Sequence, residues 1–214
     1  MLTTLVGYHE KKDAAIANVH GAHLNAAIDD VMLLKMLNEK VDAMRRIDEK
    51  HVEFEHVEGE KRVSCLIMSK ALHGCVQSAL LWHELFSSAL LKMGFKLNPC
   101  DRCAANSIVE GKQCAVCWHA DDAKISHDDP SVVSNITETL EMKFGKIPYA
   151  RGRKYDFLVM QLTFHEKGHL EIDIKSCIKS VTEDFDGGHA LKPSSTPDQS
   201  NLFDLDPRSP KIVK

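Results

Sequence analysis

The segment from Cys114 to His127 constrains the fold more than any other part of this chain. Apolar and polar residues alternate up to the pair Asp121 and Asp122, and the alternation resumes at Ala123. Such alternation is typical of strands with one buried face, and a polar break between two alternating runs predicts a tight turn. We therefore expect a β-hairpin with two carboxylates at its tip. Neighbouring side chains of an extended strand point to opposite faces, so both carboxylates can reach one cation only where the backbone turns.

Two adjacent aspartates at a turn also have a simpler interpretation. Asp is common in exposed turns because its carboxylate hydrogen-bonds to nearby backbone N–H groups. On this interpretation Asp121 and Asp122 are ordinary loop residues. The sequence on either side of the hairpin favours a functional interpretation, because it contains further motifs in a definite order.

Five blocks, in order along the chain, resemble the motifs of copia-type retrotransposon reverse transcriptases. The acidic block, Trp118-His-Ala-Asp-Asp-Ala-Lys-Ile-Ser-His127, is similar to the Tyr-Val-Asp-Asp signature of that family in its Trp-His-Val-Asp-Asp form. The other blocks are Asn18-Val-His-Gly-Ala-His-Leu-Asn25, Lys70-Ala-Leu-His-Gly-Cys-Val-Gln-Ser78, Gly94-Phe-Lys-Leu-Asn-Pro99 and Asp156-Phe-Leu-Val-Met160, followed by Ser195-Thr-Pro197 with Leu202-Phe203. The resemblance covers about residues 5 to 206, and ordered blocks are more specific than any single motif.

The resemblance implies an α+β fold like a polymerase palm, with an antiparallel sheet packed against helices and a peripheral hairpin. It also implies nucleotidyl transfer in which two Mg²⁺ ions activate a primer hydroxyl and hold the triphosphate of a dNTP, on an RNA or DNA template. In the family, Asp121 and Asp122 would act with a third aspartate at the end of the first strand, where this chain has Asn18. Asn keeps one carbonyl oxygen and loses the charge. We therefore expect weakened Mg²⁺ binding and a catalytically inactive, degenerate copy.

Three further residues inherit nucleotide or template roles from the resemblance: His23, Gly74 and Gln77. The family has an aromatic residue at the position of His23, where it packs under the incoming sugar and excludes a 2′-hydroxyl. Gly74 and Gln77 fall in the segment that floors the nucleotide pocket, although Gln77 also fits an exposed residue in the first turn of a helix. The glycine of the family's primer-holding hairpin is Val159 in this chain.

The chain has a single dense basic cluster, formed by Lys143, Lys146, Arg151, Arg153 and Lys154. The formal net charge of −4 counts against nucleic-acid binding by the chain as a whole. Lys146, Arg151, Arg153 and Lys154 are therefore the residues predicted to hold a nucleic-acid backbone, and an unengaged basic loop is the alternative. A non-catalytic nucleic-acid-binding remnant is accordingly an alternative function.

Two cysteine pairs, Cys100 with Cys103 and Cys114 with Cys117, have the spacing of zinc ligands. A zinc-stabilised interaction module is thus a further alternative. Against it, Cys114 and Cys117 lie in an expected strand, where residues three apart face opposite ways, and neither pair has the glycine that lets a zinc knuckle turn. We do not expect zinc, and we interpret the seven cysteines as small buried thiols in a reducing compartment.

The remaining sequence patterns predict the other elements. We expect a strand over residues 13–18, a helix over 26–47, a charged hairpin or linker over 48–61, a buried strand over 63–68 and a helix over about 76–93. Asp129 before Pro130 predicts an N-cap and a helix that ends at Gly145. Residues 155–174 predict a hairpin with a turn at 166–168 and with Leu158, Met160, Leu162 and Phe164 on one face, followed by a short helix to Phe185.

We expect a palm-like domain of residues 1–185 and a flexible, disordered tail of residues 186–214, which is rich in Gly, Pro, Ser and Asp. Because the chain begins just before the first block, we expect the fingers segment of a complete polymerase to be missing. No apolar run reaches membrane-spanning length and no signal segment opens the chain, which favours a soluble intracellular protein without a membrane partner. The sequence does not determine the oligomeric state.

Overall fold

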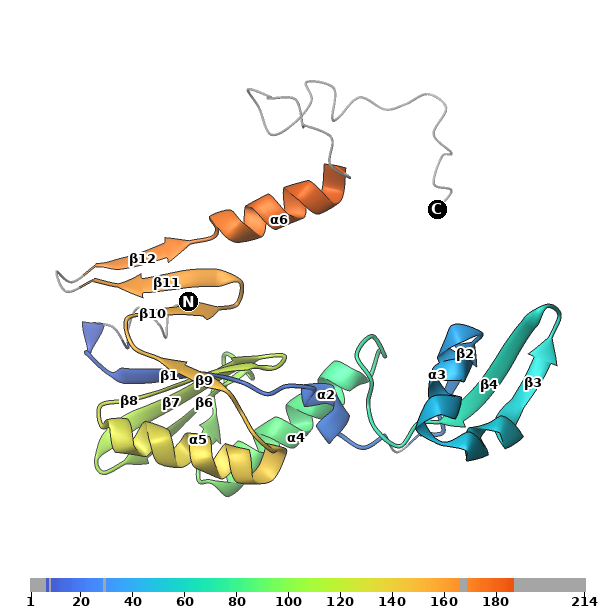
Figure 1. Cartoon of the computed structure of the whole chain (residues 1–214). Coiled ribbons are helices and arrows are strands. Elements are labelled where there is room, and N and C mark those ends of the chain that lie inside the picture. Colours follow the sequence, from blue (N-terminus) through green and yellow to red (C-terminus); the bar gives the residue numbers. More distant parts are fainter. Residues whose placement is uncertain (1–6, 8, 29, 166–168, 187–214) are drawn as a thin grey trace, which may run out of the picture. The chain divides into compact units, whose positions relative to one another are not determined.

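Figure 1 shows the computed structural model, which describes residues 7, 9–28, 30–165 and 169–186. The chain divides into two compact units, Met1–Asp173 and Ile174–Lys214. Every strand pairing among the described residues is antiparallel, and helices pack against the sheets, so the predicted α+β class is confirmed. No helix in this part of the chain is long and apolar enough to cross a membrane. The predicted tail lies outside the described residues from position 187 onward.

The largest sheet has the strand order β5-β6-β7-β8-β1-β9. Its strands are β1 Asp13–Asn18, β5 Lys96–Leu97, β6 Ala104–Val109, β7 Lys112–His119, β8 Asp122–His127 and β9 Tyr149–Arg151. Strand β1, predicted over the same residues, lies between β8 and β9. It pairs with β8 so that Asn18 is opposite Asp122. The end of the first strand therefore lies beside the predicted acidic hairpin.

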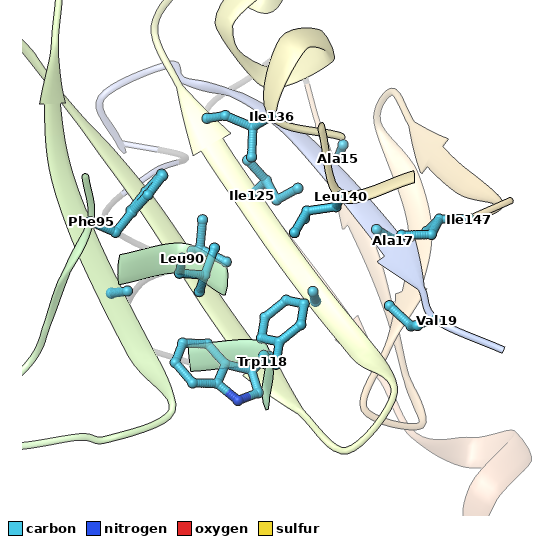
Figure 2. Close-up of a cluster of buried hydrophobic side chains, with 14 of the residues drawn as sticks. Ala15, Ala17, Val19, Leu90, Phe95, Trp118, Ile125, Ile136, Leu140 and Ile147 are labelled. Carbon is cyan, nitrogen blue, oxygen red and sulfur yellow. The ribbon is translucent and has the colours of Figure 1, made fainter. Parts of the chain in front are cut away.

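Two helices supply most of the helical side of the main core. They are α4 (Ser78–Lys92) and α5 (Pro130–Phe144), and both agree with the predicted helices. Asp129 caps α5 as expected, because its carboxylate accepts a hydrogen bond from the Ser131 N–H at 2.8 Å. Figure 2 shows the cluster that these helices form with the sheet, including Ala15, Ala17, Leu90, Trp118, Ile125 and Leu140. Alternation along β1 sends Ile16 to the other face, where it packs with Tyr155, Phe157 and Leu162.

The helix predicted over residues 26–47 is wrong in its first half. Residues Leu33–Leu37 form strand β2, and only Glu39–Ile47 form a helix, α3. Asn38 separates the two with a φ of 44°, a conformation outside the right-handed helix. The leucines of β2 fit a helical spacing, but the segment pairs along its whole length with strand β4, from Leu33 opposite Ile67 to Leu37 opposite Val63. Pairing with a strand that comes later in the chain outweighs the local period.

The charged segment after α3 contains a short 3₁₀ helix, η1 (Glu49–Phe54), and the predicted hairpin, made of β3 (Glu55–Glu58) and β4 (Lys61–Ile67). These strands form a second sheet in the order β2-β4-β3. The prediction that β4 is a buried strand is wrong, because only Val63 and Ser64 are buried in it. Few apolar side chains are buried in this sheet, and ion pairs such as Arg62 with Asp42 connect it to α3.

A third sheet, in the order β10-β11-β12, contains the predicted hairpin. Its strands are β10 Lys154–Phe157, β11 Met160–Phe164 and β12 Leu170–Asp173. Leu158 is not on a strand face as predicted, because it lies in the turn between β10 and β11. The predicted turn at 166–168 lies outside the described residues. The predicted short helix is α6 (Lys175–Asp186), in the second compact unit.

Candidate active site

The acidic hairpin ends in a two-residue turn, Ala120–Asp121, because His119 is paired with Asp122. Ala120 has a φ of 48°, and a positive φ at the first central residue is typical of type II′ turns, where glycine is favoured. Two hydrogen bonds fix this turn. The indole N–H of Trp82 on α4 donates to the Ala120 carbonyl at 2.6 Å, and the N–H of Val19, just after β1, donates to the Asp121 carbonyl at 2.8 Å.

The structure brings Asn18, Asp121 and Asp122 together at this turn. The side-chain amide of Asn18 donates to Oδ1 of Asp122 at 2.8 Å and to Oδ2 of Asp121 at 3.2 Å. Ionised carboxylates only accept hydrogen bonds, so these contacts require the NH₂ group of Asn18, not its carbonyl oxygen, to face both acids. Asp121 is exposed, and Asn18 and Asp122 are half-buried. The three positions that the sequence singled out thus form one cluster.

The donor set of this cluster does not fit a pair of Mg²⁺ ions. Two carboxylates within a few ångströms repel each other by about 4 kcal/mol at an effective dielectric constant near 20, unless a cation or a donor lies between them. Here the side-chain amide of Asn18 donates its two N–H groups to the two carboxylates, at the position where a cation would bind both. Within the described residues, no group of three or more His, Cys, Asp and Glu side chains could hold a metal. In the arrangement shown, the Asn18 amide hydrogen-bonds to both acids.

His23 is attached to the same helix that supports the acidic turn. It belongs to the short helix α2 (Ala22–Asn25), which was not predicted from the sequence. Its Nδ1 atom is 3.2 Å from the Ser78 carbonyl oxygen, and its ring packs against that of His73, with centroids 5.5 Å apart. Ser78 and Trp82 are one helical turn apart on α4, a rise of about 6 Å along the axis. Consecutive turns of α4 therefore anchor His23 and the acidic turn.

Gly74 and Gln77 lie in the loop that leads into α4. Gly74 has a φ of 94°, a conformation that favours glycine. Gln77 is exposed at the N-cap position of α4, and its amide donates to Oδ2 of Asp30 at 3.1 Å. The hydrogen bond gives Gln77 a local role at the helix start, and the positive φ gives Gly74 a local role in the preceding loop. Their roles toward a nucleotide or template stay predictions.

Arg151 is engaged within the fold. Its Nη2 donates to Oγ of Ser134 at 3.0 Å, its Nη1 lies 3.5 Å from Oδ2 of Asp13, and its guanidinium lies over the ring of Tyr149. It joins β9 to β1 and to the first turns of α5. The other members of the predicted backbone-binding set, Lys146, Arg153 and Lys154, are exposed.

The strand geometry separates the second cysteine pair as expected. Cys114 is buried on the core side of β7. Cys117, three residues further on, lies on the other face of the strand and is half-buried. Burial raises the pKa of Cys114 to about 11. Burial also raises the pKa of Cys103, and the charges of Asp101 and Cys117 raise it further. Zinc binds thiolates, so zinc binding at Cys103 or Cys114 would require the ionisation of a thiol whose pKa is raised. Whether the chain contains zinc stays a prediction.

Two polar groups of the core were missed from the sequence. Trp82 lies in the helix predicted over about 76–93 and was not predicted to contact the acidic turn, although a buried indole N–H usually finds an acceptor. Lys124 lies two residues beyond Asp122 and is buried at 3% exposure. Burial lowers the pKa of Lys124. A lysine inside an alternating strand is the signal that could have indicated a buried polar group in β8.

Comparison with known proteins adds a distant structural likeness. No family model matches the chain, and no curated protein matches it. Among solved structures, it is similar to apo telomerase from Candida tropicalis truncated from its C-terminal domain, with a TM-score of 0.42 and 8% identity. The likeness covers 80% of this chain and 39% of the telomerase chain. The function of this chain therefore has to be inferred from its own residues.

Proposed function

We propose that the chain is a degenerate palm region of a copia-type reverse transcriptase that no longer catalyses nucleotidyl transfer. The ordered sequence blocks support the origin, together with the position of the end of β1 beside the acidic turn. The observation that carries the loss of activity is the hydrogen bonding of the Asn18 amide to both Asp121 and Asp122. At that position the family has an acid.

The physical reason for the loss is charge. Mg²⁺ prefers oxygen ligands in near-octahedral geometry and is usually held by carboxylates and substrate phosphates. Replacing one carboxylate with Asn18 removes a negative charge and turns N–H donors toward the place where a cation would bind. Each 1.36 kcal/mol of lost transition-state stabilisation slows a reaction tenfold, so losing a metal ligand should lower turnover by orders of magnitude.

Metal titration of the purified chain tests this proposal. We expect the wild type to bind Mn²⁺ or Mg²⁺ weakly in calorimetry, and Asn18→Asp to bind at least about tenfold more tightly, a gain of about 1.4 kcal/mol. Asn18→Ala is the matched control, because it removes the amide donors without adding a ligand, and it should bind no more tightly than the wild type. Equal affinity for Asn18→Asp and Asn18→Ala would overturn the metal-site origin of the cluster.

Primer extension on an RNA template tests the loss of activity directly. The wild type should incorporate no nucleotide, and the double variant Asn18→Asp with His23→Phe is the form most suited to regain incorporation. Asp121→Asn in that background should abolish any activity that returns. Extension by the wild type that Asp121→Asn eliminates would show that the site is functional and would contradict the proposal.

The exposure of Lys146, Arg153 and Lys154 favours a second candidate function, nucleic-acid binding without catalysis. We expect binding of single-stranded RNA or DNA that weakens with salt and is unchanged by Asp121→Asn. Neutralising the three residues to Gln should reduce the slope of log affinity against log salt by about 0.7 for each phosphate that the protein no longer neutralises. The matched control neutralises Lys40, Lys50 and Lys61, which are exposed in the segment that contains the β2-β4-β3 sheet. Equal reductions in both triple variants would show nonspecific charge attraction.

A further inference from the structure

Strand β2 is an edge of its sheet, and its outer side has no strand partner among the described residues. The sheet has the order β2-β4-β3, so β2 pairs with β4 alone. An unpaired edge offers a row of backbone N–H and C=O groups to another strand. These strands and helix α3 all lie within the compact unit Met1–Asp173. The open edge is therefore a property of this unit alone.

The hydrogen bonds between β2 and β4 show which backbone groups face outward. The Met32 carbonyl accepts a hydrogen bond from the Met68 N–H at 2.9 Å. At the other end, the Asn38 N–H donates to the Arg62 carbonyl at 3.0 Å. Both pairs continue the register of the two strands, and hydrogen-bonded pairs alternate with non-bonded pairs in an antiparallel ladder. The even-numbered residues of β2 therefore bond to β4, and the outward backbone groups belong to Leu33, Lys35 and Leu37.

Ion pairs fasten helix α3 to the strands beyond β2. Asp42 of the helix pairs with Arg62 of β4 at 2.6 Å. Arg45 pairs with Glu55 of β3 at 2.9 Å. At the edge itself, the side chains of Leu33 and Leu37 are 61% and 39% exposed. The outer side of β2 is thus open to a further strand.

The side chains of β2 define the strand that suits this edge. Four of its five side chains are apolar: Leu33, Leu34, Met36 and Leu37. Its one charged residue, Lys35, is already paired with Glu58 of β3. A matching strand therefore needs apolar side chains on both faces and no acid. A second copy of β2 meets both conditions, whereas the opposite edge strand, β3, has two glutamates among its four residues and does not.

Two antiparallel copies of β2 match each other about Lys35. Leu33 then lies opposite Leu37 of the second copy, so outward backbone groups face outward backbone groups, and each facing pair exchanges two N–H···O bonds. A two-fold axis normal to the sheet relates the copies, which is the isologous arrangement of a closed dimer. The two Lys35 side chains face each other, but each lies beside Glu58 of its own copy, which offsets their repulsion.

We propose that β2 is a self-association edge, to which β2 of a second copy of this chain adds in the antiparallel direction to form one continuous sheet. This goes beyond the function proposed for the Asp121 and Asp122 site and does not depend on it. Two strands of five residues bury less than the roughly 800 Å² per partner of a standard interface. The association is therefore weak and reversible, with a dissociation constant on the order of 10–100 µM.

Sedimentation velocity and hydrogen exchange on the full chain test the docking. The dimer fraction should rise between about 5 and 500 µM protein. Over the same range, exchange of the outward Lys35 amide should slow, whereas exchange of the Leu34 amide, which bonds to β4, should change little. A chain that stays monomeric would overturn the proposal, and slow exchange at Lys35 in that monomer would mean that another segment of the same chain occupies the edge.

The variant Lys35→Pro tests whether the edge itself makes the dimer. Proline has no N–H, and the N–H at position 35 points outward, so the pairing with β4 is kept and the pairing with a second copy is blocked. Association should weaken at least about tenfold. Lys35→Ala is the matched control, because it removes the same charge but keeps the N–H, and it should associate at least as tightly as the wild type. Urea denaturation verifies that both variants are folded. Equal association of the two variants would contradict the proposal.

Lysines on β2 test the same edge without changing the backbone. Leu33→Lys with Leu37→Lys places like charges opposite each other in the paired strands and should leave the chain monomeric. Val52→Lys with Val57→Lys is the matched control, because it adds the same charges at exposed positions outside β2 and should keep the dimer. A dimer that survives Leu33→Lys with Leu37→Lys uses another surface, which would overturn the assignment to β2.

Discussion

Two short turns of this chain share an uncommon backbone conformation but differ in how they are supported. The acidic turn has Ala120 at a φ of 48°, and the turn between β10 and β11 has Leu158 at 52° and Val159 at 59°. An L-residue in this left-handed region costs roughly 1–2 kcal/mol. Trp82 and Val19 hold the acidic turn through hydrogen bonds, whereas the Val159 side chain is 74% exposed.

The difference separates strain that the surrounding fold holds in place from a mismatch between sequence and fold. Strained residues persist where their surroundings over-determine them. The acidic turn meets that description, because Trp82 and Val19 both hold it through hydrogen bonds. The Leu158–Val159 turn instead has positive φ at both central residues, the pattern of a type I′ turn, which favours Asn-Gly. The reverse transcriptase resemblance places a glycine where this chain has Val159, so this strain agrees with the proposed loss of function.

The largest expected effect is at Trp82, the support of the acidic turn. Trp82→Ala should lower the free energy of unfolding by about 3–5 kcal/mol, because it empties a buried core position. Trp82→Phe keeps most of the packing and removes the donor to the Ala120 carbonyl, which should cost about 1–2 kcal/mol. Urea denaturation measures both changes.

Trp118→Phe is the matched control for Trp82→Phe. Trp118 is buried in the same core (Figure 2), but its indole N–H has no hydrogen-bond partner among the described residues. Its replacement should therefore cost less than that of Trp82. Equal destabilisation by the two variants would mean that the hydrogen bond to Ala120 does not support the acidic turn.

Asn18→Asp should produce the next largest effect. Without metal, it replaces two donors with a third carboxylate, so the free energy of unfolding should fall by about 2–3 kcal/mol at neutral pH in the presence of a chelator. The destabilisation should shrink in acid, where the carboxylates become protonated, and should shrink on adding Mn²⁺. Asn18→Ala, which only removes the donors, should cost about 1 kcal/mol and should respond to neither acid nor Mn²⁺. A pH-independent destabilisation by Asn18→Asp would contradict the close approach of the three side chains.

The sequence predicts those parts of the fold that local signals determine. Short-range signals identify strand β1 by its small apolar residues, the acidic hairpin by alternation on either side of a turn, and helix α5 by the N-cap Asp129 before Pro130. Strand β2 was missed because its partner β4 comes later in the chain, and no local signal separates its leucines from a helical stripe. The short helix α2 was missed as well, because four residues are too few to show a period.

In the candidate site, too, local sequence signals predicted some features, and tertiary packing determined the others. The acids were found from alternation and the resemblance, but the proximity of Asn18 depends on β1 pairing between β8 and β9, which the residues alone do not specify. The internal contacts of Arg151 and the hydrogen bond from Trp82 depend on tertiary packing. Composition therefore indicated a phosphate-binding role for Arg151, whereas the fold uses its guanidinium to join β9, β1 and α5.

A smaller effect is expected at the second turn. Val159→Gly should raise the free energy of unfolding by about 1 kcal/mol, because relief of left-handed strain in a β-branched residue exceeds the extra flexibility of glycine in the unfolded chain. Leu158→Gly should not stabilise, since Leu158 packs against the cluster of Tyr155, Phe157 and Leu162. Thermal denaturation distinguishes the two variants. Destabilisation by Val159→Gly would show that the valine makes contacts that outweigh its strain.

The smallest effect is expected at Ala120. Ala120→Gly should change the free energy of unfolding by less than about 0.5 kcal/mol, because alanine loses less than valine in the left-handed region and the flexibility of glycine offsets the relief. Hydrogen exchange of the Val19 amide, which donates to the Asp121 carbonyl, reports whether the turn stays in place. Its protection should be retained, since the Trp82 indole N–H donates to a backbone carbonyl that any residue provides at position 120. Stabilisation as large as that of Val159→Gly would mean that the acidic turn is no better supported than the exposed one.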